Sequence, residues 1–251
     1  MRILAVGFFA LVYLVALLIM APASVFDDLV RHYSQGRLVM ANANGTMWKG
    51  TAVPALRTRD GHLIATRTLR WDIDFLPLLK GVLRARLQWN DSAPPAATEL
   101  LVSGGQVELN HALIPLPAAL LNEVSPILKP AEFRGQLEIQ SNHLVLSRRG
   151  MEGIAIVDWQ HAGSALSSID PLGNYRLTLN GAGNVVSVYL STISGVLVLE
   201  GQGKWSGSSG LEFRGKARAS SGNEERLNEL LHNLGPELSP GVATFNLTPG
   251  Q

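Results

Sequence analysis

The chain has 251 residues, of which 46% are apolar and only 16% are charged, and this composition excludes a solvated, disordered chain. Twenty-one Lys and Arg against twenty Asp and Glu leave a net charge of +1, so no strong field attracts nucleic acid and no nucleic-acid partner is expected. The absence of cysteine excludes disulfides, Cys-ligated zinc, iron–sulfur clusters and thiol nucleophiles.

The first predicted element is an uncharged apolar run from Ile3 to Met20. In a helix this run spans roughly 27–30 Å, the thickness of a hydrocarbon core. A cleaved signal peptide is the alternative, because Ala21-Pro22-Ala23 has the small residues that a signal peptidase accepts, but the run is longer than the usual apolar region of a signal. We predict a retained transmembrane anchor over residues 1–22, in contact with membrane lipid. Arg2 before the run and Asp27-Asp28 after it predict a cytoplasmic amino terminus and an exported remainder.

After the anchor, the pattern of apolar residues changes twice. Residues 25–33 carry apolar side chains at helical spacing, which predicts a helical stalk over 23–35. Beyond Gln35 the apolar residues alternate with polar ones, which is typical of half-buried strands, and we predict a β domain over 36–251.

Strands and turns follow in the first half of this domain. Alternation predicts strands at 69–75 and 83–89, joined by one helical turn in which Pro77 ends the first strand and Gly81 takes a left-handed conformation. Asp60-Gly61 predicts a two-residue hairpin turn. The loop at 90–98 is the only plausible linker, and strands of the same type flank it, so we expect one domain.

The second half continues the pattern. Further strands are predicted at 101–111, 133–147 and 153–160, with hairpin turns at Asn180-Gly181 and at 206–210. Two short amphipathic helices are predicted at 116–124 and 223–235, the second with Asn223 as N-cap and Gly235 at its end. The predicted fold class is mainly β: an N-terminal transmembrane helix followed by one elongated, twisted antiparallel β-sheet domain with short helices.

Motifs for catalysis, metal binding and cofactor binding are missing. The six histidines have no metal-ligand spacing, and no G-x-S-x-G nucleophile motif occurs. Asp158, His161 and Ser164 are close in sequence but are not favoured as a catalytic set. Gly201-x-Gly203 lacks the third glycine of a dinucleotide fingerprint, and Trp205 stands where a P-loop needs Ser or Thr. We expect no enzyme activity, no metal, no cofactor and no small-molecule substrate.

Two segments place a tryptophan between glycines: Gly45-Thr-Met-Trp48-Lys-Gly50 and Gly203-Lys-Trp205-Ser-Gly207. Glycine lets a neighbouring backbone approach closely, and the simplest interpretation is that these tryptophans fill the core of a twisted sheet. Trp48 and Trp71 in particular are predicted to be core residues in alternating strands.

The order of motifs along the chain resembles the type II secretion system protein N family. The motifs are NGTMWKG, LRWDIDFLPLLKG, VDWQHAG, DPLGNYRLTLNG, ISGVLVLEGQGKWSG, LEFRGKA and a closing LNELLHNLG. The resemblance implies a single-pass component of the inner membrane, with a periplasmic domain, in the Gram-negative machinery that exports folded proteins. It implies partners among the inner-membrane components of that secretion platform and supplies no catalytic residues. The matching positions, taken as fold-defining, are Gly45, Trp48, Gly50, Trp71, Leu79, Gly81, Trp159, Gly173, Gly195, Gly203, Trp205 and Gly207.

Two functional hypotheses follow. The first is a scaffold or accessory protein of the secretion platform, which docks through sheet edges and through its anchor. The second is a lipid-handling envelope protein, similar to the AsmA-like and lipopolysaccharide-transport proteins, in which a twisted sheet lines an apolar groove. Alternation alone does not separate them, because a groove-lining face and a core face are both apolar.

Overall fold

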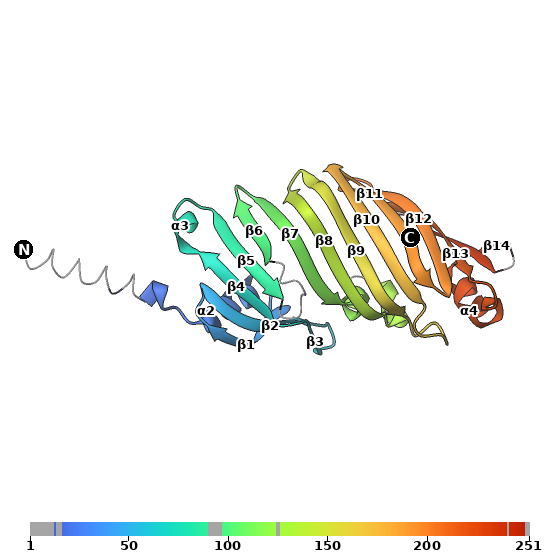
Figure 1. Ribbon diagram of the computed structural model, residues 1–251, viewed down its shortest axis with the longest axis horizontal. Helices are drawn as coiled ribbons and strands as arrows, with labels where there is room; N and C mark the ends of the chain where they lie inside the picture. Colours follow the sequence, from blue (N-terminus) through green and yellow to red (C-terminus); the bar gives the residue numbers. More distant parts are fainter. Residues whose placement is uncertain (1–12, 14–16, 90–96, 124–125, 240, 249–251) are drawn as a thin grey trace, which may run out of the picture. The chain divides into compact units, whose positions relative to one another are not determined.

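The computed structural model of the chain is mainly β, with antiparallel strands and few helices (Figure 1). It describes residues 13, 17–89, 97–123, 126–239 and 241–248. Most of the predicted anchor lies outside these residues. Among the residues described, no helix combines the length and the apolar character needed to cross a bilayer. The chain divides into two compact units, residues 1–95 and 96–251, which are considered in turn.

The first unit is a small antiparallel sheet with a helix, α2 (Ala23–Tyr33), packed on it. Its strands are β1 (Leu38–Gly45), β2 (Lys49–Arg57), β3 (Leu63–Ala65), β4 (Leu69–Asp74) and β5 (Leu83–Trp89). They pair in the order β1-β2-β4-β5, and β3 pairs with the C-terminal end of β2. The single-turn helix α3 (Phe75–Leu78) reverses the chain between β4 and β5.

Local prediction succeeds for most of this unit. The helix after the anchor is present, burial alternates along β4 as predicted, and Gly81 is left-handed with φ +72°. The hairpin at Asp60-Gly61 is also present, but its turn is longer than two residues, because the Thr58 N–H donates to the His62 carbonyl (2.8 Å). Gly61, with φ +86°, is the third residue of that loop, where a left-handed glycine is usual.

Trp71 is the centre of the first unit's core. Its side chain is 1% exposed, its ring lies over Gly50, and its Nε1–H donates to the Met47 carbonyl (3.0 Å). The Phe26 ring of α2 packs against it at a centroid distance of 4.9 Å. The helix predicted to be a stalk thus packs on the sheet.

Trp48 differs from the prediction. It lies in the turn between β1 and β2 and is half-buried, whereas the sequence predicted a core position in a strand. The two glycines that flank it, Gly45 and Gly50, form the last pair of the β1–β2 ladder, so the tryptophan itself lies beyond the ladder. Its ring meets Phe75 edge-on at 5.0 Å, and its Nε1–H donates to the Leu18 carbonyl (2.8 Å).

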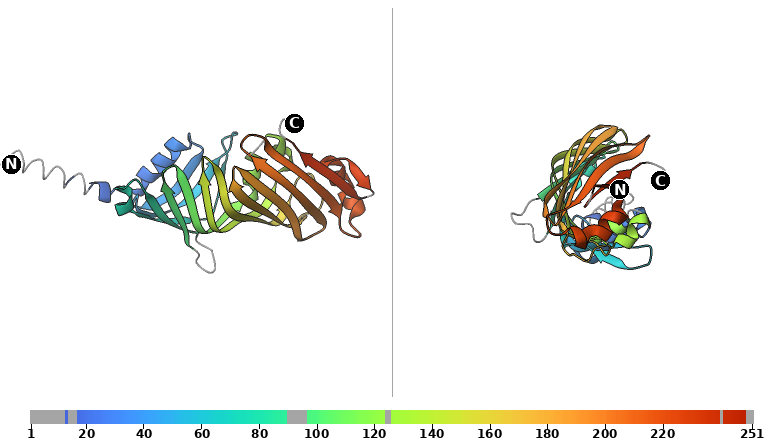
Figure 2. Two further views of the ribbon diagram at one scale, coloured as in Figure 1. Left: turned by 90° about the horizontal axis from the view of Figure 1, so that it is seen from above. Right: turned by 90° about the vertical axis from the view of Figure 1, so that its right-hand side faces the viewer.

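The second unit is a curled antiparallel sheet in which consecutive strands pair (Figure 2). Its strands are β6 (Ala97–Ser103), β7 (Gln106–Pro117), β8 (Arg134–Ser147), β9 (Gly150–Gly163), β10 (Gly173–Gly183), β11 (Val185–Gly195), β12 (Leu197–Ser206), β13 (Gly210–Ala219), β14 (Glu237–Ser239) and β15 (Val242–Leu247). At the end of this series β15 pairs with β13, and the short β14 lies outside β15.

Two strand predictions in this unit are wrong in the position of a turn. The stretch 101–111 is not one strand but parts of two, because Gly104-Gly105, both left-handed, form the turn between β6 and β7. The hairpin predicted at Asn180-Gly181 exists, but its turn is Gly183-Asn184. Gly181 lies within β10, where glycine is required because a Cβ would meet Met151. The hairpin at 206–210 and the strands of 133–147 and 153–160 are confirmed.

The two helix predictions for this unit have different outcomes. The helix at 223–235 is confirmed as α4 (Glu224–Leu234), although Asn223 makes no side-chain cap hydrogen bond and Gly235 is extended. The helix at 116–124 is confirmed in part: β7 continues to Pro117, and the helical residues after it form 3₁₀ helices, η1 (Ala118–Glu123) and η2 (Pro126–Ala131).

The helices of the second unit all lie at one end of the sheet. Helices η1, η2 and α4 occupy connections at this end, whereas short turns join β6–β7, β8–β9, β10–β11 and β12–β13 at the other (Figure 1). Leu227, Leu230 and Leu231 of α4 are buried against the apolar face of β12, β13 and β15. At the end with the short turns, none of the described helices of this unit covers that face.

Candidate functional site

The positions that match the family motifs have three kinds of environment. Trp71 is buried, Trp48 and Trp159 are half-buried, and Trp205 and Leu79 are 41% and 73% exposed. Gly81 and Gly207 lie in turns with open space around them. A Cβ would collide with a neighbouring backbone or ring at the remaining positions, which are Gly45, Gly50, Gly173, Gly195 and Gly203. The motif therefore combines packing positions with exposed ones.

Aromatic rings lie flat over several of the strand glycines. Phe213 covers Gly201 and Gly203, and a Cβ on Gly201 would lie 2.5 Å from the Phe213 Cζ. Phe245 covers Gly215 in the same way, and the Phe213 and Phe245 rings stack with centroids 6.0 Å apart. From the sequence, tryptophans were expected to pack where glycine allows a close approach. In the second unit phenylalanines do so instead, and no local spacing links Phe213 to Gly201.

An apolar groove runs over the sheet between β8 and β13. Cross-strand pairing aligns Val186, Trp205 and Leu211 in one row, and Leu179, Val188 and Gly203 in the next. Val186 and Val188 form a buried floor with exposures of 4% and 6%. The groove has a volume of about 460 Å³, within the usual range for ligand sites. Its lining residues are Leu146, Ser147, Gly150, Met151, Leu177, Leu179, Val186, Val188, Trp205 and Leu211.

The rim of the groove is exposed and its mouth is basic. Leu146 and Trp205 stand at its two sides and are 39% and 41% exposed. Ser147 and Gly150 line the groove from the two sides of the β8–β9 turn, and the residues between them are Arg148 and Arg149, both exposed. The Arg149 N–H donates to the Ser147 Oγ (3.1 Å), so this hydroxyl already accepts one hydrogen bond.

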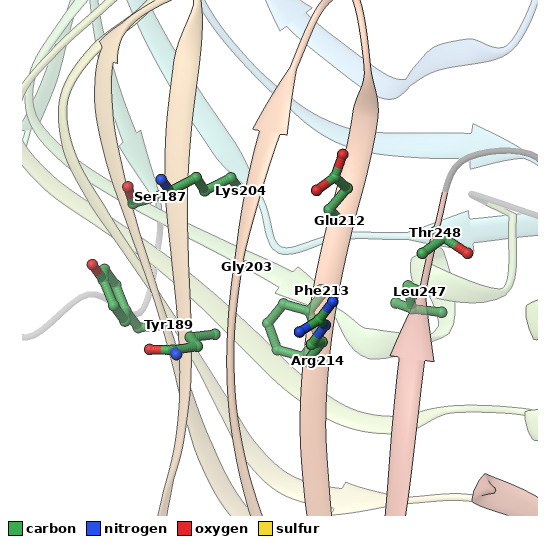
Figure 3. Close-up of a pocket in the computed structure, with 10 residues that line it drawn as sticks. Ser187, Tyr189, Gly203, Lys204, Glu212, Phe213, Arg214, Leu247 and Thr248 are labelled. Atoms are coloured by element: carbon green, nitrogen blue, oxygen red, sulfur yellow. The ribbon is translucent and has the colours of Figure 1, made fainter.

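The opposite face of the same strands is polar (Figure 3). Ser187, Lys204 and Glu212 form one cross-strand row there, and Tyr189 and Arg214 belong to the next (Figure 3). A shallow hollow of about 340 Å³ lies over these residues. The alternation in β11–β13 therefore separates a polar face from the apolar groove.

The structure does not join Asp158, His161 and Ser164 into one hydrogen-bonded cluster among the described residues. Asp158 accepts two hydrogen bonds from Arg176, both 2.7 Å long, and the Ser164 Oγ donates to the Ala131 carbonyl (2.7 Å). The hydrogen bond with Asp158 raises the pKa of Arg176. These partners hold the side chains in structural contacts, and no hydrogen bond joins the three in the described part of the chain.

Tyr175 is a further side chain whose polar group is buried. It is 2% exposed, its hydroxyl donates to the Leu197 carbonyl (2.9 Å), and burial raises its pKa. Within the described ranges, no group of three or more His, Asp or Glu side chains is arranged to hold a metal ion.

The first and last strands in the strand order, β1 and β14, differ in what they offer a partner. On β1 the Met40 N–H donates to Asp27 of α2 (2.7 Å), and the strand bulges between Ala41 and Asn44. Both features protect a strand from further pairing. β14 is only three residues long, and Leu238 on it is 64% exposed.

Comparison with known proteins gives one match. The family model described as type II secretion system, protein N, matches residues 36–246. No curated protein and no solved structure matches the chain.

Proposed function

Because the chain belongs to the type II secretion system protein N family, we propose that it acts in type II secretion as an accessory scaffold anchored in the inner membrane. The observation that carries this proposal is the family match, which spans nearly all of the predicted periplasmic domain. In this proposal the protein catalyses no reaction. It holds inner-membrane components of the secretion platform in place while they export folded proteins from the periplasm.

Contacts between the last residues of the predicted anchor and the first sheet support an anchored scaffold. The Trp48 Nε1–H donates to the Leu18 carbonyl (2.8 Å), and the Met47 N–H donates to the Ala21 carbonyl (2.8 Å). Pro22 also forms a bridge with Thr46. The end of the apolar segment therefore lies against the β1–β2 turn, and the chain continues from it into α2. An anchor tied in this way would hold the first unit close to the membrane surface.

Deletion of the gene tests the proposed function. A secreted hydrolase should accumulate in the periplasm of the deletion strain, while its passage across the inner membrane continues. The intact chain supplied in trans is the control, and it should restore release to the medium. A loss of some scaffold contacts lowers the population of an assembly without abolishing it, so the defect is expected to be partial.

The outcome also separates the two functional classes. Normal secretion with increased permeability of the outer membrane to detergents would contradict the secretion role and favour lipid handling. Normal behaviour in both assays would contradict both.

Membrane topology is tested separately. A reporter that works only after export should be active when fused after Gln251, and the protein should resist carbonate extraction. A mature protein that begins at Ser24 would show that the apolar segment is a cleaved signal.

A further inference from the structure

The apolar groove of the second unit is open to solvent at the helix-free end of the sheet. Its floor is buried and its rim residues Leu146 and Trp205 are 39% and 41% exposed. At the other end of the same sheet face, α4 covers the apolar residues with three buried leucines. An apolar surface left open beside one that the chain covers itself is a sign of an external ligand.

The groove offers a ligand few hydrogen bonds. The strands that form it, β8 to β13, pair on both sides, so their backbone groups are already used. The polar side-chain groups in its lining are two, the Ser147 hydroxyl, which already accepts from the Arg149 N–H, and the Trp205 indole N–H. A peptide in this groove would leave its own N–H and C=O groups unpaired against an apolar wall, which costs free energy. An acyl chain has no such groups.

The mouth of the groove carries positive charge. Arg148 and Arg149 form the tip of the β8–β9 turn, between the two lining residues Ser147 and Gly150. In the described part of the chain neither guanidinium has an ion-pair partner. The four turns at this end, at 103–106, 147–150, 183–184 and 206–210, contain no acidic residue. Guanidinium groups are well suited to phosphate, which they bind through paired N–H donors.

The geometry points to a binding site for an anionic phospholipid, with an acyl chain in the groove over Val186 and Val188 and its phosphate at Arg148 and Arg149. The volume of about 460 Å³ is that of a small-ligand site, and one acyl chain is the part of the lipid that would enter it. This site is independent of the secretion role proposed above, and its test does not depend on secretion.

Photo-crosslinking of the full chain in its own membrane tests the site. The photoreactive residue p-benzoylphenylalanine replaces Trp205 or Leu146 at the rim, in cells whose phospholipids carry radioactive phosphate. The matched control replaces Tyr189, which is 50% exposed on the polar face of the same sheet. Irradiation should give a phosphate-labelled adduct at the two rim positions and none at Tyr189.

Two pairs of charge variants then test the headgroup contact. The double variant Arg148→Gln/Arg149→Gln should lower the labelled adduct at Trp205 by roughly fivefold, since each exposed charge pair contributes a factor of about two to five. Its control, Arg214→Gln/Lys216→Gln, removes the same charge from exposed residues of β13 and should leave the adduct unchanged. All four side chains are exposed, so folding is preserved.

Three results would overturn the proposal. They are the absence of a labelled adduct at both rim positions, equal labelling at Tyr189, and a protein adduct in place of a lipid adduct. The last would show that a polypeptide occupies the groove. An adduct that both double variants lower equally would remove the assigned headgroup contact.

Discussion

Substitution of Gly201 by alanine tests whether glycine is needed where an aromatic ring lies on the sheet. A Cβ at this position would lie 2.5 Å from Cζ and 2.6 Å from Cε1 of Phe213, far inside contact distance. Phe213 is 5% exposed and stacks on Phe245, so its ring has little room to move away. Overpacking of this kind costs about 1–3 kcal/mol, and we expect Gly201→Ala to lower the free energy of unfolding by about 2 kcal/mol.

The assay is thermal unfolding of the full chain in a non-ionic detergent, followed by circular dichroism of the β-sheet band. For a unit of this size about 2 kcal/mol corresponds to a fall of roughly 4–8 °C in Tm. Gly207→Ala is the matched control, because a Cβ there would have nothing within 4 Å. It should leave Tm almost unchanged.

A double-mutant cycle then identifies the cause. In a Phe213→Ala background the ring is gone, and the nearest remaining neighbour of the new Cβ is the Arg214 carbonyl at 3.0 Å. Gly201→Ala should then cost less, because only the shift of this carbonyl remains, which gives a coupling energy of roughly 1–2 kcal/mol between the two positions. If Phe213→Ala does not fold, Phe213→Leu serves with a smaller coupling. An equal loss of Tm with and without the ring would refute the reasoning and assign the cost to the backbone.

Three further predictions concern other contacts, each measured by thermal or urea unfolding of the full chain. Burial raises the pKa of Tyr175 above its ordinary value of 10.0, so its contribution to stability is complete below pH 10 and is lost as pH rises further. Tyr175→Phe should lower the free energy of unfolding by about 1 kcal/mol at neutral pH, because its hydrogen bond is lost. Above pH 10 this variant should lose less stability than the wild type. Arg176→Gln leaves the buried Asp158 carboxylate without its partner and should lower Tm more than Arg176→Gln combined with Asp158→Asn; an equal effect would show that Asp158 is solvated. Leu79→Ser should leave Tm unchanged because Leu79 is 73% exposed, whereas Trp71→Leu should lower it by several degrees.

The sequence predicts those elements whose cause is local. Alternation over residues 69–75 and 83–89 identifies β4 and β5, because one face of each strand is wet. The helical spacing of 223–235 identifies α4, because the same three leucines that set the period are buried. Pro77 and Gly81 predict the turn between the two strands through their own backbone preferences, which act within a segment of about six residues.

The errors have tertiary causes. Asn180-Gly181 is a strong turn signal, yet Gly181 is a strand residue, and its glycine is needed for the approach of Met151 from the neighbouring strand. The stretch 101–111 reads as one strand because apolar residues continue on both sides of Gly104-Gly105. In each case the glycine could lie in a turn or within a strand, and the pairing with the neighbouring strand determines which.

The groove could not be predicted from the sequence, because it depends on rows of residues that run across strands. Val186, Trp205 and Leu211 are neighbours only through the register of β11, β12 and β13. A single signal was available in the sequence: Arg148 and Arg149 stand together in a turn between two alternating strands. That signal gives the charge at the mouth but not the apolar surface beside it.

The placement of the helices decides which part of the apolar face stays open. Every strand from β8 to β13 presents apolar residues on the same face, and along most of a soluble sheet such a face must be covered. The connections at one end are long enough to form η1, η2 and α4, and α4 buries its leucines there. The connections at the other end are tight turns that contain glycine, and none can supply a covering helix. The turns at that end are therefore too short to cover the groove over Val186 and Val188. An outside molecule that covered it would contact the exposed rim residues Leu146 and Trp205.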